Sequence, residues 1–189
     1  MRRWGTVAAA LVLAGAGVVG AAGAAGAATV PAGKAPAACS TAWGSTDKSA
    51  TDANIEPLKN IRTSHTACYD RMVFDIGGAT GKVGYHVGYV DAFHQDGSGE
   101  QIPVKGGAIL QIYVSAPSHD PATGKQTYGG TAGKPLPGVN ISGYSTFKDT
   151  KFGASFEGQT QVGLGVRARL PFRVVQSGQE LIVDVAHTW

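Results

Sequence analysis

The sequence predicts an all-β protein, an antiparallel β-sandwich that carries a disulfide-tethered N-terminal arm. From Asn54 onward, short runs of alternating apolar residues are separated by Gly, Pro, Asp and Ser. No window places apolar residues at i, i+3, i+4 and i+7 over three turns, as an amphipathic helix requires. Apolar residues make up 43% of the chain, enough to bury a core at its low net charge of +3. Many short strands with frequent turns are typical of a sandwich or barrel.

Residues 1–28 have the pattern of a secretory signal peptide. They begin with Arg2 and Arg3, continue as an Ala, Gly, Val and Leu run, and end in small residues where a signal peptidase cuts. We expect cleavage after Ala27 or Ala28. Glycines interrupt the run, whereas a membrane anchor needs about 20 continuous apolar residues. The sequence therefore predicts a secreted, extracellular protein without a membrane span in the mature chain, and cell-wall association is a further expectation.

The charge of the expected mature chain argues against nucleic-acid binding. Removing Arg2 and Arg3 from the 16 basic residues leaves 14, against 13 acidic residues. A nucleic-acid binder needs a surplus of Lys and Arg to displace counterions from phosphates. We expect a monomer that has no nucleic-acid partner.

Residues 29–53 are rich in Ala, Ser, Thr and Gly and show neither helical nor strand periodicity, which predicts a linker or arm. Cys39 and Cys68 form an even pair in an exported chain, and such a pair most simply makes a disulfide. That bond closes a loop of about 30 residues and fastens Trp43 against the sandwich. A metal site is the alternative, but no second Cys or His lies at ligand spacing. We expect no metal and no cofactor.

The sandwich domain is expected over residues 54–189. Met72, Phe74 and Ile76 share one face of its first clear strand, and a polar stretch over 115–138 predicts a long loop. The expected strands cover residues 71–76, 85–89, 109–114, 139–147, 152–157, 161–167, 172–176 and 181–187.

The last two expected strands form a hairpin whose register the sequence specifies. Gly178 occupies the first central position of the turn over 177–180, which suits a type II′ turn. That turn sets Phe172 opposite Val185 and Arg173 opposite Asp184. An apolar residue then faces an apolar residue, and a positive charge faces a negative one, as favourable cross-strand pairs require. We interpret the charged pair as structural.

One loop concentrates polar groups that invite a search for catalysis. Asp91, His94 and Asp96 lie close together within residues 91–100. The loop departs from a calcium-binding loop, because a histidine stands where the first acid belongs and no bidentate Glu follows at the right distance. A polar turn is the simpler interpretation. Nothing in the sequence assembles a catalytic triad or a metal cage, so we expect no enzyme and no catalytic residue.

A glycine lane on one strand is the most distinctive local pattern. Val162, Leu164 and Val166 point to the core, which leaves the glycines at 163 and 165 on the opposite face. Glycine inside a strand marks a close approach by a ligand, a backbone or a bulky neighbour. The lane is therefore either a recognition surface or a place where a large side chain from an adjacent strand, such as a Tyr, packs.

If the lane is a recognition surface, arginines are the expected ligands for wall carboxylates or phosphates, because their planar forks bind such groups bidentately. Two tyrosines on one strand face could stack on sugars, although core packing is an equal alternative. The candidate binding residues are Arg62, Arg71, Tyr85, Tyr89, Arg167 and Arg169.

Several motifs, taken in order, resemble the AMIN-like domain of secreted actinobacterial proteins. They lie at residues 60–63, 68–75, 84–91, 96–99, 155–158, 165–174 and 181–187. More distantly, the chain resembles AMIN domains, small β-sandwiches that direct cell-wall amidases and secretion machinery to peptidoglycan. AMIN-type domains often carry a proline in the turn before the last strand, and this chain has none at 177–180.

The resemblance implies a non-catalytic targeting or binding module of the cell envelope. The expected partner is a cell-wall glycan such as peptidoglycan, or a wall-associated envelope protein. The alternative is a secreted hydrolase with an unfamiliar site around Asp91, His94 and Asp96. Convergence of those three side chains in one pocket is the observation that would favour the hydrolase.

Overall fold

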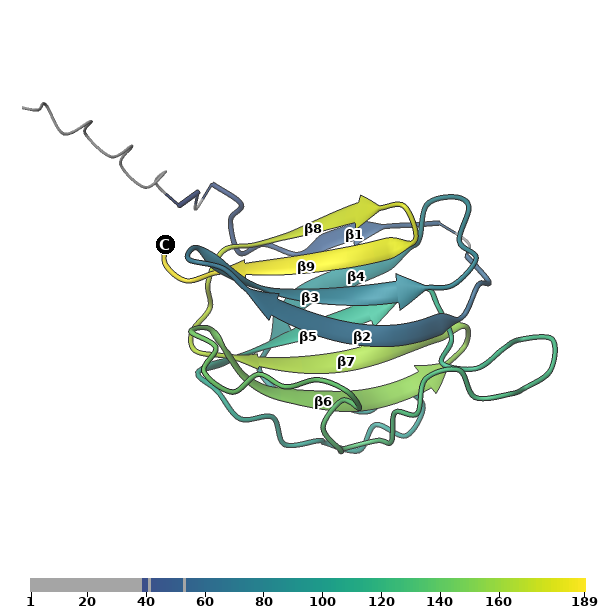
Figure 1. Ribbon diagram of the computed structural model, residues 1–189. Helices are drawn as coiled ribbons and strands as arrows, with labels where there is room; N and C mark the ends of the chain where they lie inside the picture. Colours follow the sequence, from purple (N-terminus) through teal and green to yellow (C-terminus); the bar gives the residue numbers. More distant parts are fainter. Residues whose placement is uncertain (1–38, 41, 53) are drawn as a thin grey trace, which may run out of the picture. The chain divides into compact units, whose positions relative to one another are not determined.

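The computed structural model describes residues 39–40, 42–52 and 54–189, which form two antiparallel sheets and no helix (Figure 1). This confirms the all-β sandwich. Sheet A has the order β1-β4-β5-β7-β6 and sheet B the order β2-β3-β9-β8. Sheet A consists of β1 (Lys48–Ala50), β4 (Tyr85–Val90), β5 (Ala108–Val114), β7 (Gln159–Val166) and β6 (Phe147–Phe156). Sheet B consists of β2 (Leu58–His65), β3 (Tyr69–Ile76), β9 (Glu180–Ala186) and β8 (Phe172–Ser177).

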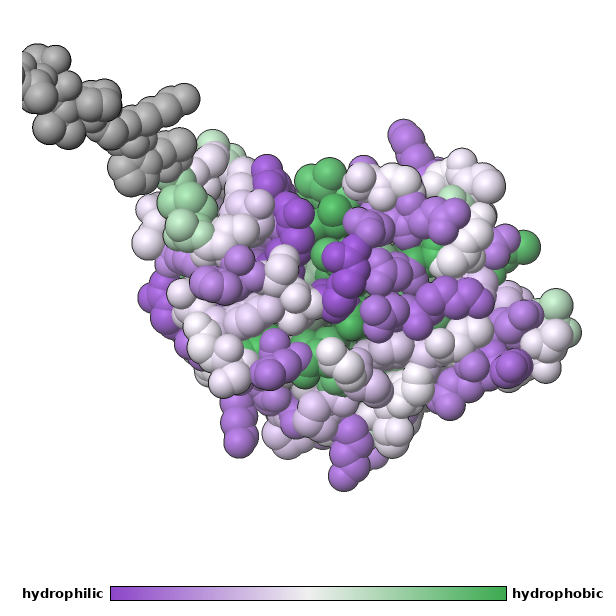
Figure 2. All heavy atoms as spheres, viewed as in Figure 1, coloured by the Kyte–Doolittle hydropathy of each residue, from purple (hydrophilic) through white to green (hydrophobic). Residues whose placement is uncertain are grey.

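Alternating side chains on both sheets build one hydrophobic core between them. Met72 and Phe74 of β3 and Leu110 and Ile112 of β5 are all fully buried. Successive residues of a strand point to opposite faces, so the intervening side chains lie on the outer faces of the sandwich. Each large apolar side chain buried in this way contributes about 1.5–3 kcal/mol. Seen as in Figure 1, the surface is a mixture of hydrophilic residues and residues of intermediate hydropathy, with hydrophobic residues visible between them (Figure 2).

The predicted strand over 139–147 is wrong. Residues 139–146 form turns, and only Phe147 belongs to β6. Gly138 and Gly143 have φ values of 74° and 80°, which break an extended chain, and the Ser142 N–H donates to the Asn140 carboxamide. This local turn chemistry overrides the apolar pattern.

Strand β2 was not among the expected strands, and its register explains why. Its buried residues Leu58 and Ile61 are three positions apart because a bulge shifts the pairing with β3 between Leu58 and Asn60. A bulge inserts an extra residue and disrupts the period-two pattern.

The arm is attached to both sheets. Cys39 and Cys68 form the expected disulfide, with their Cα atoms 5.2 Å apart. Trp43 packs edge-on against Tyr69, and the Arg173 guanidinium lies 4.4 Å from the Trp43 ring. Contrary to the expectation of an arm without strand structure, residues 48–50 form β1 and pair with β4. The predicted signal peptide over 1–28 and arm residues 29–38 lie outside the described residues.

The predicted C-terminal hairpin is confirmed in register and turn. Phe172 pairs with Val185, and Arg173 pairs with Asp184. Gly178 has a φ of 56°, the positive value that the first central position of the turn requires. The Arg173 guanidinium donates to the fully buried Asp184 carboxylate at 2.8 Å, which confirms a structural pair.

Candidate ligand-binding groove

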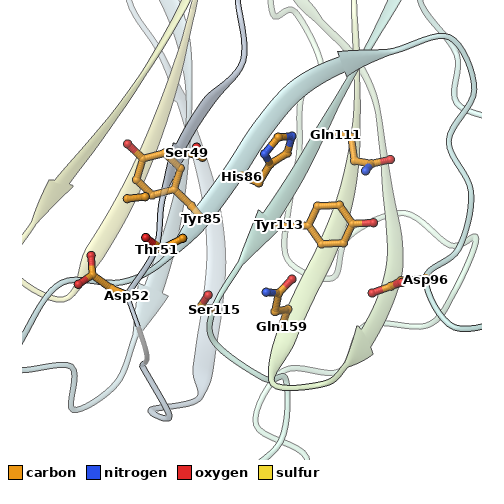
Figure 3. Close-up of a pocket in the computed structure, with 11 residues that line it drawn as sticks. Ser49, Thr51, Asp52, Tyr85, His86, Asp96, Gln111, Tyr113, Ser115 and Gln159 are labelled. Atoms are coloured by element: carbon orange, nitrogen blue, oxygen red, sulfur yellow. The ribbon is translucent and has the colours of Figure 1, made fainter.

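A groove of about 880 Å³ lies on the outer side of sheet A (Figure 3). Its walls come from the arm, from β4, β5 and β7, and from the loop between β4 and β5. The lining residues are Ser49, Ala50, Thr51, Asp52, Tyr85, His86, Asp96, Gln111, Tyr113, Ser115 and Gln159.

Strand register explains how polar residues reach the groove. Ser49 of β1 pairs with His86 of β4, His86 pairs with Tyr113 of β5, and Tyr113 pairs with Gln161 of β7. These four residues form one row across four strands. Because the neighbouring Val87 and Ile112 are buried in the core, the row must lie on the outer face.

Gln161 is a buried residue that holds the end of this row. Its amide Nε2 donates to the His94 carbonyl at 2.7 Å and to the Tyr113 hydroxyl at 3.0 Å. Its Oε1 accepts the Asp96 N–H at 2.9 Å. The pKa of Tyr113 is raised, first by burial and then by the negative charge of Asp96, while the Gln161 hydrogen bond opposes the shift. Gln161 thus fixes both a groove tyrosine and the loop beside it.

Several polar side chains in the groove are free to bind a ligand. Gln111 and Gln159 make no side-chain hydrogen bond within the described part of the chain, and the same holds for Ser49, Thr51 and Asp52. A small number of such polar groups in a concave site is what orients a bound ligand. The groove therefore offers amide, hydroxyl and carboxylate groups beside the Tyr113 ring.

The glycine lane of β7 is not open to a ligand. Phe93, from the loop between β4 and β5, is fully buried against it, and a Cβ atom at Gly163 would lie 2.8 Å from the Phe93 ring. The Lys105 carbonyl packs against Gly165 in the same way. Of the two interpretations of the lane, a recognition surface or a packing site, the structure supports the packing site. The large side chain comes from a loop rather than from an adjacent strand.

The predicted arginines of sheet B are already paired with acids on its outer face. Arg62 contacts Asp75 at 3.2 Å and also forms a short contact with Glu180. Arg71 contacts Asp184 at 2.6 Å, and this hydrogen bond is the main cause that raises the pKa of Arg71. Both arginines lie on the opposite sheet from the groove.

The other predicted site residues lie in two further places. Arg167 donates to the His187 carbonyl, and the Arg169 guanidinium lies 5.1 Å from the Tyr89 ring. The Tyr89 hydroxyl donates to the Leu170 carbonyl at 2.8 Å and packs against the core. Within the described part of the chain, Tyr85 is the one predicted binding residue of the six that lines the groove.

Asp91, His94 and Asp96 do not share one cavity in the described structure. Asp96 lines the groove, whereas Asp91 is exposed outside it. The His94 ring nitrogen Nδ1 contacts the Gly99 carbonyl at 3.0 Å. Within residues 39–40, 42–52 and 54–189, no group of three or more His, Cys, Asp and Glu side chains is arranged to hold a metal ion.

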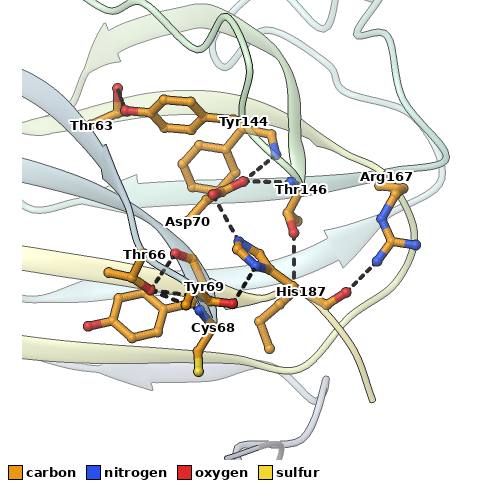
Figure 4. A network of polar contacts seen from close by, with 12 residues as sticks. Thr63, Thr66, Cys68, Tyr69, Asp70, Tyr144, Thr146, Arg167 and His187 are labelled. Atoms are coloured by element: carbon orange, nitrogen blue, oxygen red, sulfur yellow. Dashed lines mark hydrogen bonds and ion pairs between the residues drawn. The ribbon is translucent and has the colours of Figure 1, made fainter. Parts of the chain in front are cut away.

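A second polar cluster has its partners inside the protein (Figure 4). The fully buried Asp70 carboxylate accepts the N–H groups of Thr146 at 2.6 Å and Phe147 at 3.0 Å, and His187 Nε2 lies 3.0 Å from its other oxygen. His187 Nδ1 lies 3.2 Å from the Ala67 carbonyl. A buried carboxylate needs such partners, so this cluster joins sheet B to the start of β6.

Part of the groove carried a signal that sequence reasoning missed. Gln111, Tyr113 and Ser115 alternate with the buried Leu110 and Ile112, which marks them as a polar outer face on an otherwise apolar strand. The arm residues of the groove carried no such signal. Their position depends on pairing between β1 and β4, which brings together residues far apart in the sequence.

The fold defines a class of protein, a small antiparallel β-sandwich domain. Within that class, the AMIN-like domain family model matches residues 56–187, and the chain belongs to this family. No curated protein and no solved structure matches it.

Family membership indicates a peptidoglycan-associated targeting module, since AMIN-like domains are generally non-catalytic binding modules. Membership and the disulfide indicate an extracellular or envelope location. Among the described residues, no helix has the length and apolar character needed to cross a membrane.

Proposed function

We propose that this protein is a non-catalytic cell-envelope module that binds the glycan of peptidoglycan in the groove of sheet A. The observation that carries the proposal is the set of free amide and hydroxyl groups beside the Tyr113 ring. Sugars present hydroxyl groups that pair with such side chains and an apolar ring face that packs on an aromatic ring.

The dimensions of the groove support the same proposal. Its volume of about 880 Å³ lies within the roughly 300–1,000 Å³ range of small-molecule sites. The row of Ser49, His86 and Tyr113 crosses three paired strands, so the binding groups sit on a rigid sheet. A rigid backbone avoids the entropy cost of ordering a loop on binding.

The arginines give a competing proposal for the same function. Arg167 and Arg169 lie after β7, where their present partners are a backbone carbonyl and an aromatic ring. Neither is paired with a carboxylate in the described structure, so both could bind wall carboxylates or phosphates. This proposal predicts binding that weakens as salt is added.

Retention of the purified protein on isolated peptidoglycan distinguishes the two proposals. Three variants are compared with the parent: Gln111→Ala with Gln159→Ala, Arg167→Ala with Arg169→Ala, and Gln126→Ala as control. Gln126 is an exposed glutamine in a loop outside the groove. The groove proposal expects the double glutamine variant to lose about tenfold in affinity and the control to bind as the parent does.

Each result has a defined meaning. Loss of retention in the arginine variant alone, with its melting temperature unchanged, moves the site to the arginines and overturns the groove proposal. Failure of the parent itself to bind peptidoglycan refutes the proposed function.

A further inference from the structure

The charge of the groove constrains which saccharide it can hold. Asp52 from the arm and Asp96 from the loop lie on opposite sides of the groove, with Tyr113 between them (Figure 3). None of the described lining residues is Lys or Arg. The groove thus carries two carboxylates, one on each side, and no Lys or Arg among its described lining residues.

The described side chains do not neutralise either carboxylate. Asp96 accepts the Gly97 N–H at 3.1 Å and forms no ion pair within the described part of the chain, and Asp52 likewise forms none. Lys82 lines a neighbouring hollow with Asp52, but no ion pair joins the two. His86, the basic residue of the groove, lies 3.7 Å from Asp47 and so has an acid of its own.

The negative charge of Asp96 also acts on Tyr113. Burial is the main cause that raises the pKa of Tyr113, and the Asp96 charge adds to it, because a nearby negative charge disfavours the phenolate. A carboxylate or phosphate on a ligand would meet the same repulsion. A protonated amine would instead be attracted.

Resting on the proposed function, we infer that the groove binds a saccharide with free, protonated amino groups in preference to the same saccharide with those groups acetylated. Asp52 and Asp96 are the specificity-determining residues, and the amides, hydroxyls and Tyr113 ring bind the sugar itself. Pairs between partly exposed charges are individually weak, so the expected preference is about three- to tenfold in affinity. Sugars that carry carboxylates bind more weakly than either.

The test uses two probes of equal length, a glucosamine oligosaccharide and its fully N-acetylated counterpart. Calorimetry measures both affinities at a pH where the amines carry charge. The informative variant is Asp52→Asn with Asp96→Asn, which keeps the shape of both side chains. Asp91→Asn is the matched control, because Asp91 is an exposed carboxylate of the same loop that does not line the groove.

We expect the parent and Asp91→Asn to prefer the glucosamine probe, and the double variant to bind both probes equally. Equal binding of both probes by the parent overturns the charge inference and leaves the proposed function intact. A preference that persists in the double variant overturns the assignment to Asp52 and Asp96. A lysine-containing peptide that binds where the glucosamine probe does not overturns the saccharide assignment. Absence of binding to either probe and to peptidoglycan refutes both proposals.

Discussion

The two outer faces of the sandwich use polar residues in opposite ways. On sheet B, Arg71 and Arg173 both contact the buried Asp184, so that the charges of that face are largely satisfied within the protein. On the groove side of sheet A, Gln111 and Gln159 have no partner among the described residues. Charged residues therefore do not by themselves mark a binding face. The polar groups left without partners are the better indicator.

Sheet A itself shows a second contrast between its two halves. Phe93 and the loop that carries it cover the glycines of β7, while the part built from β1, β4, β5 and the first residue of β7 remains open as the groove. The same loop supplies Asp96 to the groove wall. The loop that covers the glycines of β7 thus also forms part of the groove wall.

The largest expected effect is the loss of this cover. Phe93→Ala removes a fully buried ring and leaves a cavity above the glycines, which should lower the free energy of unfolding by about 3–5 kcal/mol. Urea denaturation measures the change. Phe93→Leu, which keeps most of the volume, is the control and should cost clearly less. A cost under about 1 kcal/mol for Phe93→Ala would show that the loop is not packed on the lane.

A smaller effect is expected from breaking the charge network of sheet B. Asp184→Ala leaves Arg71 and Arg173 without their carboxylate and should cost about 2–4 kcal/mol, below the value for a fully buried pair because both arginines are partly exposed. Asp75→Ala breaks a more exposed pair with Arg62 and should cost under about 1 kcal/mol. Equal costs for the two variants in chemical denaturation would contradict the difference in burial.

The smallest expected effect is on the groove tyrosine at alkaline pH. Because the pKa of Tyr113 is raised above its ordinary value of 10.0, its contribution to stability is fully present below pH 10.0 and is lost as pH rises through the raised pKa. Asp96→Asn removes a negative charge and should lower that pKa. Phenolate absorbance, taken as the difference from Tyr113→Phe, measures it. An unchanged or higher pKa in Asp96→Asn would contradict the negative potential that we infer for the groove.

These contrasts also show what the sequence could and could not predict. Strand β5 alternates cleanly, and the hairpin around Gly178 carries its own turn signal, so both follow from local chemistry. The missed β2 contains a bulge, and the false strand over 139–147 contains the turn glycine Gly143 and directly follows another, Gly138. These two errors arose where a local backbone feature overrode the apolar pattern.

The groove was harder to predict because it depends on the order of strands. Ser49, His86 and Tyr113 become neighbours only in the sheet order β1-β4-β5. The arginines were predicted as binding residues from their chemistry alone. The sequence does not reveal whether an arginine is already paired with an acidic residue of the same chain. Pairing between distant residues is a property of the folded chain.

The disulfide has a mechanical consequence. Cys39 is bonded to Cys68, and the Cys68 carbonyl accepts the N–H of His187 at 2.9 Å. A pulling force applied between residues 39 and 187 is therefore carried by the disulfide, by this hydrogen bond and by the contacts of His187 with Ala67 and Asp70. The groove on sheet A lies outside that short load path.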